Sequence, residues 1–301
     1  MKKIMTVTIG IAAYNEEKGI ERVLHQILAQ ETSFCKIDKI ILRCDGCTDN
    51  TARNALRVID DSSIITLIND KNRIGLAESL NTICQKNQSD ILIFLDADCT
   101  IDDNFIIEKI ATKFSDPEIG IVSGNALPIR GSGIIQKIAY EWIMCWYSCR
   151  KSYLSGDNVN NHFGVVSAIS KNLAKNMIIP SNLVGVPDYV YFFGKSLGYK
   201  YVFVEQAKVF YRPAATIKDY LYQTARHHGS KDQIIKIFGE GIVNSYVIPK
   251  DIKRRAMVTS LFSSPILFPL ACLLQIYLRI FQQVYNKNYN NGLWDIIPTT
   301  K

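Results

Sequence analysis

The chain has 301 residues, of which 48% are hydrophobic and 21% are charged, as in an ordinary globular protein with a sizeable core. The formal net charge is +7, but the basic residues are scattered apart from one cluster near residue 250, so nucleic acid is not an expected partner. Eight cysteines at uneven spacing, with no signal peptide before the first expected strand, predict reduced thiols in the cytosol. Cys44 and Cys47 have CxxC spacing, but no second pair follows at a zinc-finger distance.

The first hundred residues alternate between strand and helix patterns. Strands are predicted over residues 7–12, 39–44, 64–68 and 91–95. The helix after the first strand has one apolar face, made of Ile20, Val23, Leu24, Ile27 and Leu28. This alternation predicts an α/β fold with a Rossmann-like, mostly parallel sheet flanked by helices. No GxGxxG or GxxxxGK[ST] motif opens any of these helices, so neither a dinucleotide site nor a P-loop is expected.

The second half of the chain is less regular. A strand over residues 120–127, an aromatic-rich helix over 134–153 and a strand over 163–169 are predicted, followed by a helix and two short strands within 186–213. We expect a main domain over residues 1–249, a basic and hydrophobic segment over 250–285, and a polar tail over 286–301.

Two carboxylates follow the fourth predicted strand, whose five residues are all apolar. Asp96 and Asp98 are two residues apart, so in an extended backbone they project together from the carboxyl end of that strand. Ligands of open α/β sheets bind at this edge. Paired carboxylates repel each other unless a cation or proton lies between them, and their oxygens suit Mg²⁺ or Mn²⁺. The alternative is a solvated turn, where aspartate is common.

Five motifs in order carry a resemblance to a known family. They are IGIAAYNEE, LRCDGCTDNT, NRIGLAESLN, FLDADCT and VPDYVYFFGKSLGYK. From about residue 7 to residue 229 the chain resembles the inverting family 2 glycosyltransferases of GT-A fold, which move a sugar from a nucleotide donor to an acceptor hydroxyl. The sequence departs from the family pattern at Ala13, where proline is usual, and at Pro187, where glutamate usually precedes the aspartate.

The resemblance implies a role for each matching residue. The nucleotide-sugar donor, a UDP-sugar by resemblance, would contact Ala12, Tyr14, Glu16, Asp45, Arg73, Gly75, Asp96 and Ala97. Asp96 and Asp98 would hold Mg²⁺ or Mn²⁺ against the diphosphate, and Asp188 would be the general base. Inversion does require a carboxylate that takes the acceptor's proton opposite the leaving group. The alternatives are a helix N-terminal carboxylate for Asp188 and a turn residue for Asp45.

The segment YQTARHHGS resembles the QxxRW motif of processive relatives. By this resemblance Gln223, Arg226 and His227 would help to hold the acceptor and the donor diphosphate. His227 replaces tryptophan, and imidazole offers a sugar ring a smaller stacking face, which argues against polymer synthesis.

Two other functions fit parts of the sequence. DADCT matches the DxDxT signature of haloacid-dehalogenase-like phosphatases, with Asp96 as nucleophile and Asp98 as acid and base. That family has this motif on its first strand and needs a later acid pair, but Asn161 stands where the second acid would be. A non-catalytic sugar-nucleotide-binding membrane protein is the other alternative.

The last feature is a hydrophobic segment over residues 256–278, which contains 23 residues and no charged side chain. As one helix it would be about 34 Å long and could cross a bilayer. Lys250, Lys253, Arg254 and Arg255 precede it, so we expect a cell-membrane protein with a cytoplasmic catalytic domain. The acceptor would then be a sugar or lipid-linked molecule in cell-surface polysaccharide or glycolipid synthesis. Two prolines and three serines favour instead a kinked helix at the interface, and a buried core helix is the third alternative.

Overall fold

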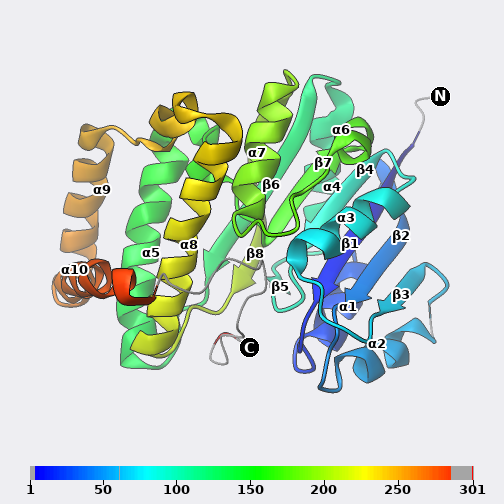
Figure 1. Cartoon of the computed structure of the whole chain (residues 1–301), viewed down its shortest axis with the longest axis horizontal. Helices are drawn as coiled ribbons and strands as arrows, with labels where there is room; N and C mark the ends of the chain where they lie inside the picture. Colours follow the sequence, from blue (N-terminus) through cyan, green and yellow to red (C-terminus); the bar gives the residue numbers. More distant parts are fainter. Residues whose placement is uncertain (1–3, 61, 286–299, 301) are drawn as a thin grey trace.

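One eight-stranded sheet organises the chain, with helices on both of its faces (Figure 1). The structure is a computed structural model and describes residues 4–60, 62–285 and 300. The strand order is β3-β2-β1-β4-β7-β6-β8-β5. The strands are β1 (Met5–Ala13), β2 (Cys35–Cys44), β3 (Ile65–Asn69), β4 (Ile91–Leu95), β5 (Thr100–Ile101), β6 (Ile119–Pro128), β7 (Val166–Ser170) and β8 (Lys200–Tyr211).

The α-helices follow the strands closely in the first half of the chain and dominate its end. They are α1 (Ile20–Leu28), α2 (Thr51–Ile59), α3 (Leu76–Lys86), α4 (Ile106–Ala111), α5 (Ile134–Ser152), α6 (Lys171–Asn176), α7 (Val186–Ser196), α8 (Ile217–Phe238), α9 (Lys250–Ser263) and α10 (Leu267–Tyr285). A 3₁₀ segment, η4 (Glu240–Tyr246), connects α8 to the last two helices.

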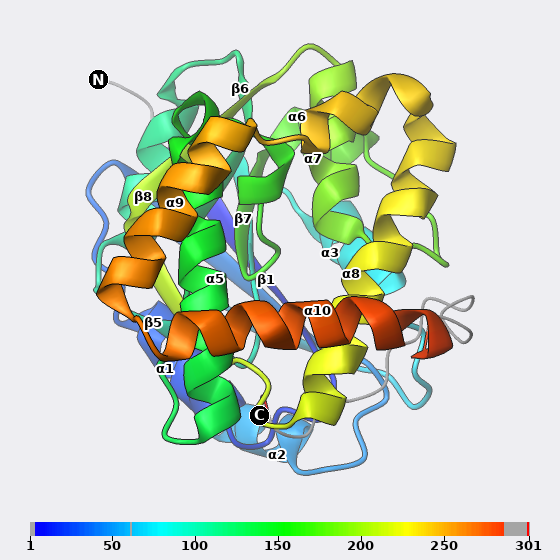
Figure 2. The same cartoon turned by 90° about the vertical axis from the view of Figure 1, so that its left-hand side faces the viewer.

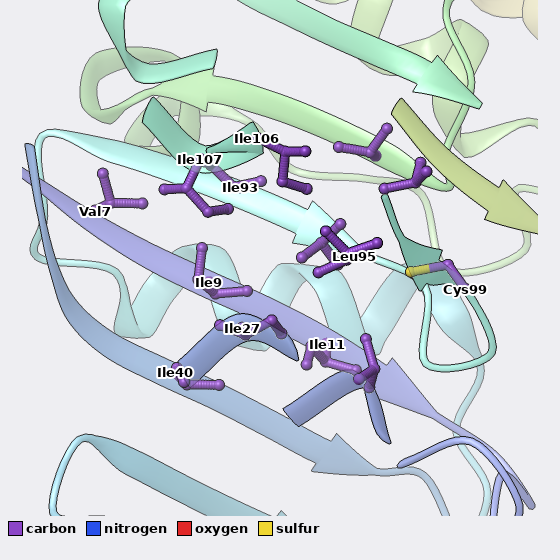
Figure 3. Close-up of a cluster of buried hydrophobic side chains, with 14 of the residues drawn as sticks. Val7, Ile9, Ile11, Ile27, Ile40, Ile93, Leu95, Cys99, Ile106 and Ile107 are labelled. Carbon is purple, nitrogen blue, oxygen red and sulfur yellow. The ribbon is translucent and has the colours of Figure 1, made fainter. Parts of the chain in front are cut away.

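The predicted α/β pattern is confirmed in β1 to β4, which are all parallel where they pair with one another. The five residues of β4 are buried on both faces of the sheet. Ile93 and Leu95 pack on the side of α1 and α4 (Figure 3), while Leu92 and Phe94 pack against α3 on the other side. A continuous apolar run is therefore what this strand requires, because neither face meets water.

The second half of the sheet differs from the sequence prediction in two ways. Strand β7 is antiparallel to both β4 and β6 and lies between them. Instead of two short strands, β8 is one strand of 12 residues that runs parallel to β6, with a register shift between Ser123 and Asn125. The strand thus stays continuous through this local shift in pairing.

The expectation of one continuous helix over residues 256–278 is wrong. Helix α9 ends at Ser263 and α10 starts at Leu267, with Pro265 between them. Proline cannot donate a backbone hydrogen bond and its ring clashes with the preceding turn, so the helix stops there. Among the residues that the structure describes, no helix has the length and apolarity needed to cross a membrane.

The two helices instead lie against the rest of the chain. Helix α9 packs along α5, and α10 crosses α5 and α8 on the outside (Figure 2). Ala256 and Phe268 are buried in a cluster with Cys145 and Cys149 of α5. The predicted polar tail over residues 286–301 lies outside the described residues except for Thr300.

Candidate active site

The two aspartates of the DxD motif stand at the carboxyl end of β4, as the sequence predicts. Asp96 and Asp98 are half-buried, and Ala97 and Cys99 beside them are buried. The guanidinium of Arg22 donates hydrogen bonds to the backbone carbonyls of Asp98 and Cys99, both at 3.4 Å. Burial, and then the nearby charges of Asp96 and Asp98, raise the pKa of the Cys99 thiol. This turn is thus a fixed, negatively charged position at the edge of the sheet.

The donor set at this position suits a hard divalent cation. Among the side chains that the structure describes, no group of three or more histidine, cysteine and acidic residues is arranged to hold a metal. Two carboxylates alone do not fill a Mg²⁺ or Mn²⁺ coordination sphere, but a bound diphosphate and water would supply further oxygens. Asp96 and Asp98 therefore fit a metal that binds together with a nucleotide.

The loops after β1 and β2 are joined by hydrogen bonds that short-range patterns did not predict. Asn15, which has a positive φ of 55°, accepts a hydrogen bond through its side-chain oxygen from the backbone N–H of Thr48 at 2.8 Å. The backbone N–H of Glu16 donates to the hydroxyl of Thr51 at 2.7 Å. Ala12 and Tyr14 lie in the same segment and are half-buried. The predicted nucleotide residues of β1 thus border the loop that carries Asp45.

Asp45 is buried and fixes the neighbouring loop through both carboxylate oxygens. One oxygen accepts the backbone N–H of Ile74 at 2.7 Å, and the other accepts that of Gly75 at 2.8 Å. Gly46, with φ +64°, allows the backbone of Arg73 to approach so closely that any Cβ would collide with it. A carboxylate has about four acceptor positions, so Asp45 retains capacity for a ligand. Its observed contacts nevertheless make it an organiser of the residue 73–75 loop.

Arg73 connects that loop to the end of β1. Its guanidinium carbon lies 3.9 Å from the centre of the Tyr14 ring, a cation–π contact. The sequence placed Tyr14, Arg73 and Gly75 in one nucleotide site, and the structure brings them together.

Asp188 lies in the first turn of α7, after Pro187, and its nearest polar partner comes from far along the chain. The hydroxyl of Tyr246, at the end of η4, donates to Asp188 Oδ2 at 2.9 Å. Burial raises the pKa of the Asp188 carboxyl to about 6, although the Tyr246 hydrogen bond and the charge of Lys231 act in the lowering direction. A carboxylate whose pKa approaches neutrality is suited to accept a proton. The assignment of Asp188 as the base stays a prediction, and no sequence signal pointed to Tyr246 as its partner.

A buried histidine, His162, contacts the backbone of the residue that precedes Asp188 in the chain. His162 Nδ1 lies 2.7 Å from the carbonyl of Pro187, and Nε2 lies 2.7 Å from the hydroxyl of Ser167. Burial lowers the pKa of His162 to about 4, so the ring is neutral. Because a carbonyl only accepts, Nδ1 carries the proton and Nε2 accepts from Ser167. His162 was not predicted, and its position in the polar loop SGDNVNNH was the one available signal.

The loop after His162 joins the two carboxylate positions. The carbonyl of Val165 accepts the backbone N–H of Asp96 at 3.1 Å, and a Cβ on Gly164 would lie 2.9 Å from the ring of Pro187. Val166, the next residue, pairs with Leu95 at the end of β4. The end of β4 and the start of α7 therefore lie on either side of one short loop.

The predicted acceptor motif lies on α8. Gln223 is half-buried, and the side chains of Arg226 and His227 lie outside what the structure describes. Gln233, further along α8, accepts the backbone N–H of Val184 at 2.9 Å, so α8 packs against the loop that leads to Asp188.

Ligands of open α/β sheets bind at the carboxyl ends of the strands, and Asp45 and Asp96 directly follow β2 and β4 at this edge. The model of the family described as "Glycosyl transferase family 2" matches residues 8–173. The chain therefore belongs to glycosyl transferase family 2. This membership speaks against the phosphatase alternative for Asp96 and Asp98.

Curated relatives and solved structures agree with this family. The chain is 30% identical over 167 residues to a poly-beta-1,6-N-acetyl-D-glucosamine synthase of Staphylococcus aureus, which covers 55% of this chain and 40% of that protein. A synthase of the same name from Staphylococcus epidermidis is 25% identical over 177 residues, or 58% of this chain and 42% of that protein. The chain thus spans about 40% of the length of these relatives.

Two solved structures show a similar GT-A-like fold. A mannosyltransferase from Pyrobaculum calidifontis in complex with GDP-Man and Mn²⁺ has a TM-score of 0.61 and 16% identity, covering 93% of this chain and 76% of that one. Glucosyl-3-phosphoglycerate synthase from Mycobacterium tuberculosis, in complex with Mn²⁺, UDP and phosphoglyceric acid, has a TM-score of 0.55 and 16% identity, covering 78% and 79%.

Proposed function

We propose that the protein transfers a sugar from a nucleotide-sugar donor to an acceptor hydroxyl with inversion at the anomeric carbon. The observation that carries this proposal is the pair of carboxylate positions joined by the loop from His162 to Val165. Asp96 and Asp98 stand on one side of that loop and Asp188 on the other. An inverting transfer needs the leaving group on one side of the sugar and the base on the other, and we propose that these carboxylates serve those two sides.

Asp188 is the proposed general base. As the acceptor oxygen forms its bond to the anomeric carbon, the hydroxyl proton passes to Asp188 and the electron pair of the breaking bond stays on the nucleoside diphosphate. Tyr246 holds Asp188 Oδ2, and His162 holds the carbonyl of Pro187, so the carboxylate is kept in one orientation. Fixed orientation is the main contribution that such partners make to a reacting group.

The donor side consists of the loops after β1, β2 and β3. Tyr14 and Arg73 are proposed to contact the nucleotide, with Asp45 shaping the loop that receives its base. Asp96 and Asp98 would hold Mg²⁺ or Mn²⁺, which when bound supplies neutralisation of the diphosphate charge. The solved relatives carry UDP in one case and GDP-Man in the other, and resemblance favours a UDP-sugar here.

The proposed acceptor is a sugar or lipid-linked molecule at the cytoplasmic face of the cell membrane, in polysaccharide or glycolipid synthesis. The curated relatives are named for synthesis of a β-1,6-linked N-acetylglucosamine polymer, which supports polysaccharide chemistry. Gln223, Arg226 and His227 of α8 are proposed to serve the acceptor and diphosphate side. The packing of α8 against the loop before Asp188 supports this placement.

The test is a donor screen on the purified full chain. UDP- and GDP-sugars are incubated with Mn²⁺, and release of the nucleoside diphosphate is measured with and without saccharide and polyprenyl-phosphate-sugar acceptors. We expect acceptor-dependent release from UDP-sugars, and its loss in Asp188→Asn with nucleotide binding retained. Acceptor-dependent release at the wild-type rate in that variant would show that Asp188 is not the base.

A further inference from the structure

Helix α10 carries apolar side chains on both its inner and its outer face. Its inner face, which includes Phe268, Ala271 and Leu278, is buried against the body of the molecule. Its outer face is apolar as well: Leu273 is 62% exposed and Ile280 is 64% exposed. A helix at a water-exposed surface normally carries polar residues on its outer side, and a large exposed apolar surface marks an interaction site. Packing on α5 and α8 accounts for only the inner half of α10.

Helix α9 and the connection to α10 continue the same surface. Phe262 is 83% exposed and Ile266 is 75% exposed. Ile252 and Ala256 turn toward α5, which leaves the opposite side of α9 outward. Between the two helices lies a groove of about 270 Å³ whose lining is entirely apolar, formed by Met257, Val258, Leu261, Phe268, Pro269 and Cys272. Figure 2 shows both helices on the face of the molecule turned toward the viewer, with α9 beside α5 and α10 crossing α5 and α8.

This apolar surface is rimmed by positive charge. Residues 250–281 contain five basic side chains and one acidic side chain: Lys250, Lys253, Arg254, Arg255 and Arg279 against Asp251. Asp251 is paired with Arg255 at 2.9 Å. Arg254 precedes Val258 and Phe262 by four and eight residues, a spacing that places all three on one side of the helix. Basic and apolar groups therefore share the outward face.

We propose that the outer face of α9 and α10 docks on an anionic lipid membrane, with the two helices lying along its surface and not crossing it. Exposed apolar side chains enter the boundary between headgroups and acyl chains, while the basic residues meet lipid phosphates. The groove between the helices offers apolar space for part of an acyl chain. Membrane docking would bring the site to a lipid-linked acceptor, and only this link to the acceptor rests on the proposed function.

Charge favours a membrane over a second copy of the chain. A symmetric dimer formed through this face would bring two basic surfaces together, and like charges across an interface are unfavourable. The anionic surface of a membrane attracts the same residues. Self-association is therefore an outcome that the experiment must separate from lipid binding.

The test is co-sedimentation of the full chain with vesicles of equal parts phosphatidylcholine and phosphatidylglycerol, beside vesicles of phosphatidylcholine alone. We expect the wild type to pellet with the anionic vesicles and to be released by salt, because the charge contribution is screened. The triple change Phe262→Ser, Leu273→Ser and Ile280→Ser should weaken binding roughly tenfold or more, since each removes apolar surface. Arg254→Gln should weaken it by roughly a factor of five.

A matched control removes three exposed apolar side chains elsewhere: Leu56→Ser, Ile178→Ser and Leu197→Ser. We expect wild-type vesicle binding in this control. Equal loss in the control and the test variant, or a wild type that stays in the supernatant with both vesicle types, would overturn the proposal. So would a wild-type dimer that the test variant dissociates while vesicle binding is unchanged, since the face would then serve a second copy. UDP binding is measured separately by calorimetry. A failure of membrane docking can therefore be distinguished from a failure of the proposed nucleotide-sugar function.

Discussion

The charge state of Asp188 links the stability of the fold to the proposed chemistry. Burial raises its pKa from 3.8 to about 6, so the folded chain holds a proton there more tightly than the unfolded chain does. The stability that this proton binding contributes is complete below about pH 4 and is lost as the pH rises through about 6. At pH 7.5 the ionised carboxylate therefore destabilises the fold.

Replacing Asp188 by asparagine removes this cost. The shift from 3.8 to about 6 corresponds to about 3 kcal/mol at about 1.4 kcal/mol per pKa unit. Asp188 is only partly buried, and solvent screening reduces this to about 1–2 kcal/mol. The asparagine oxygen can still accept the hydrogen bond of the Tyr246 hydroxyl. We therefore expect Asp188→Asn to be more stable than the wild type at pH 7.5, with this difference falling to about half at pH 5, because the carboxyl of the unfolded chain is still mostly ionised there.

Thermal unfolding at pH 5, 6 and 7.5 measures the difference. For a chain of this size about 1–2 kcal/mol corresponds to roughly 2–6 °C in melting temperature. Asp38→Asn is the matched control, because Asp38 is exposed and the same exchange there should leave the melting temperature unchanged. A variant at Asp188 whose stability difference does not change with pH, or that is less stable at pH 7.5, would refute the reasoning. In the wild type, transfer should fall as the pH drops below about 6, because the proposed base becomes protonated.

Three further changes test neighbouring parts of the site. Tyr246→Phe removes a hydrogen bond that lowers the pKa of Asp188, so the acid limb of the pH–rate profile should move to higher pH, and an unmoved limb would contradict this. Asp45→Ala leaves two backbone N–H groups without their charged acceptor, so the free energy of unfolding in urea should fall by about 2–4 kcal/mol and UDP binding should weaken. Unchanged UDP binding would show that the loop does not contact the nucleotide. Asp98→Asn should weaken UDP binding in Mn²⁺ but not in EDTA, and calorimetry that shows equal loss in both would argue against a metal role.

Local sequence patterns determine the strands and helices of the first half of the chain and the position of the DxD motif. The apolar run of β4 predicts a strand buried on both faces, and burial of all five of its residues follows from that pattern. The alternation of strands with amphipathic helices predicts the parallel half of the sheet. The DxD turn then falls at the carboxyl edge of the sheet, because it directly follows β4 in the chain. The family could be inferred because its motifs are short and keep their order along the chain.

Other features depend on contacts between residues far apart in the sequence. Tyr246 is 58 residues from Asp188, and His162 is 25 residues from Pro187, so no periodicity relates these partners. The antiparallel insertion of β7 between β4 and β6 is likewise a matter of strand pairing, which local patterns do not encode. The raised pKa of Asp188 exists only because packing removes water from the carboxylate. In the hydrophobic segment, the break between α9 and α10 can be explained from the sequence, because Pro265 ends the helix. Which apolar side chains of α9 and α10 are buried against α5 and α8, and which remain exposed, is decided only by how the two helices pack.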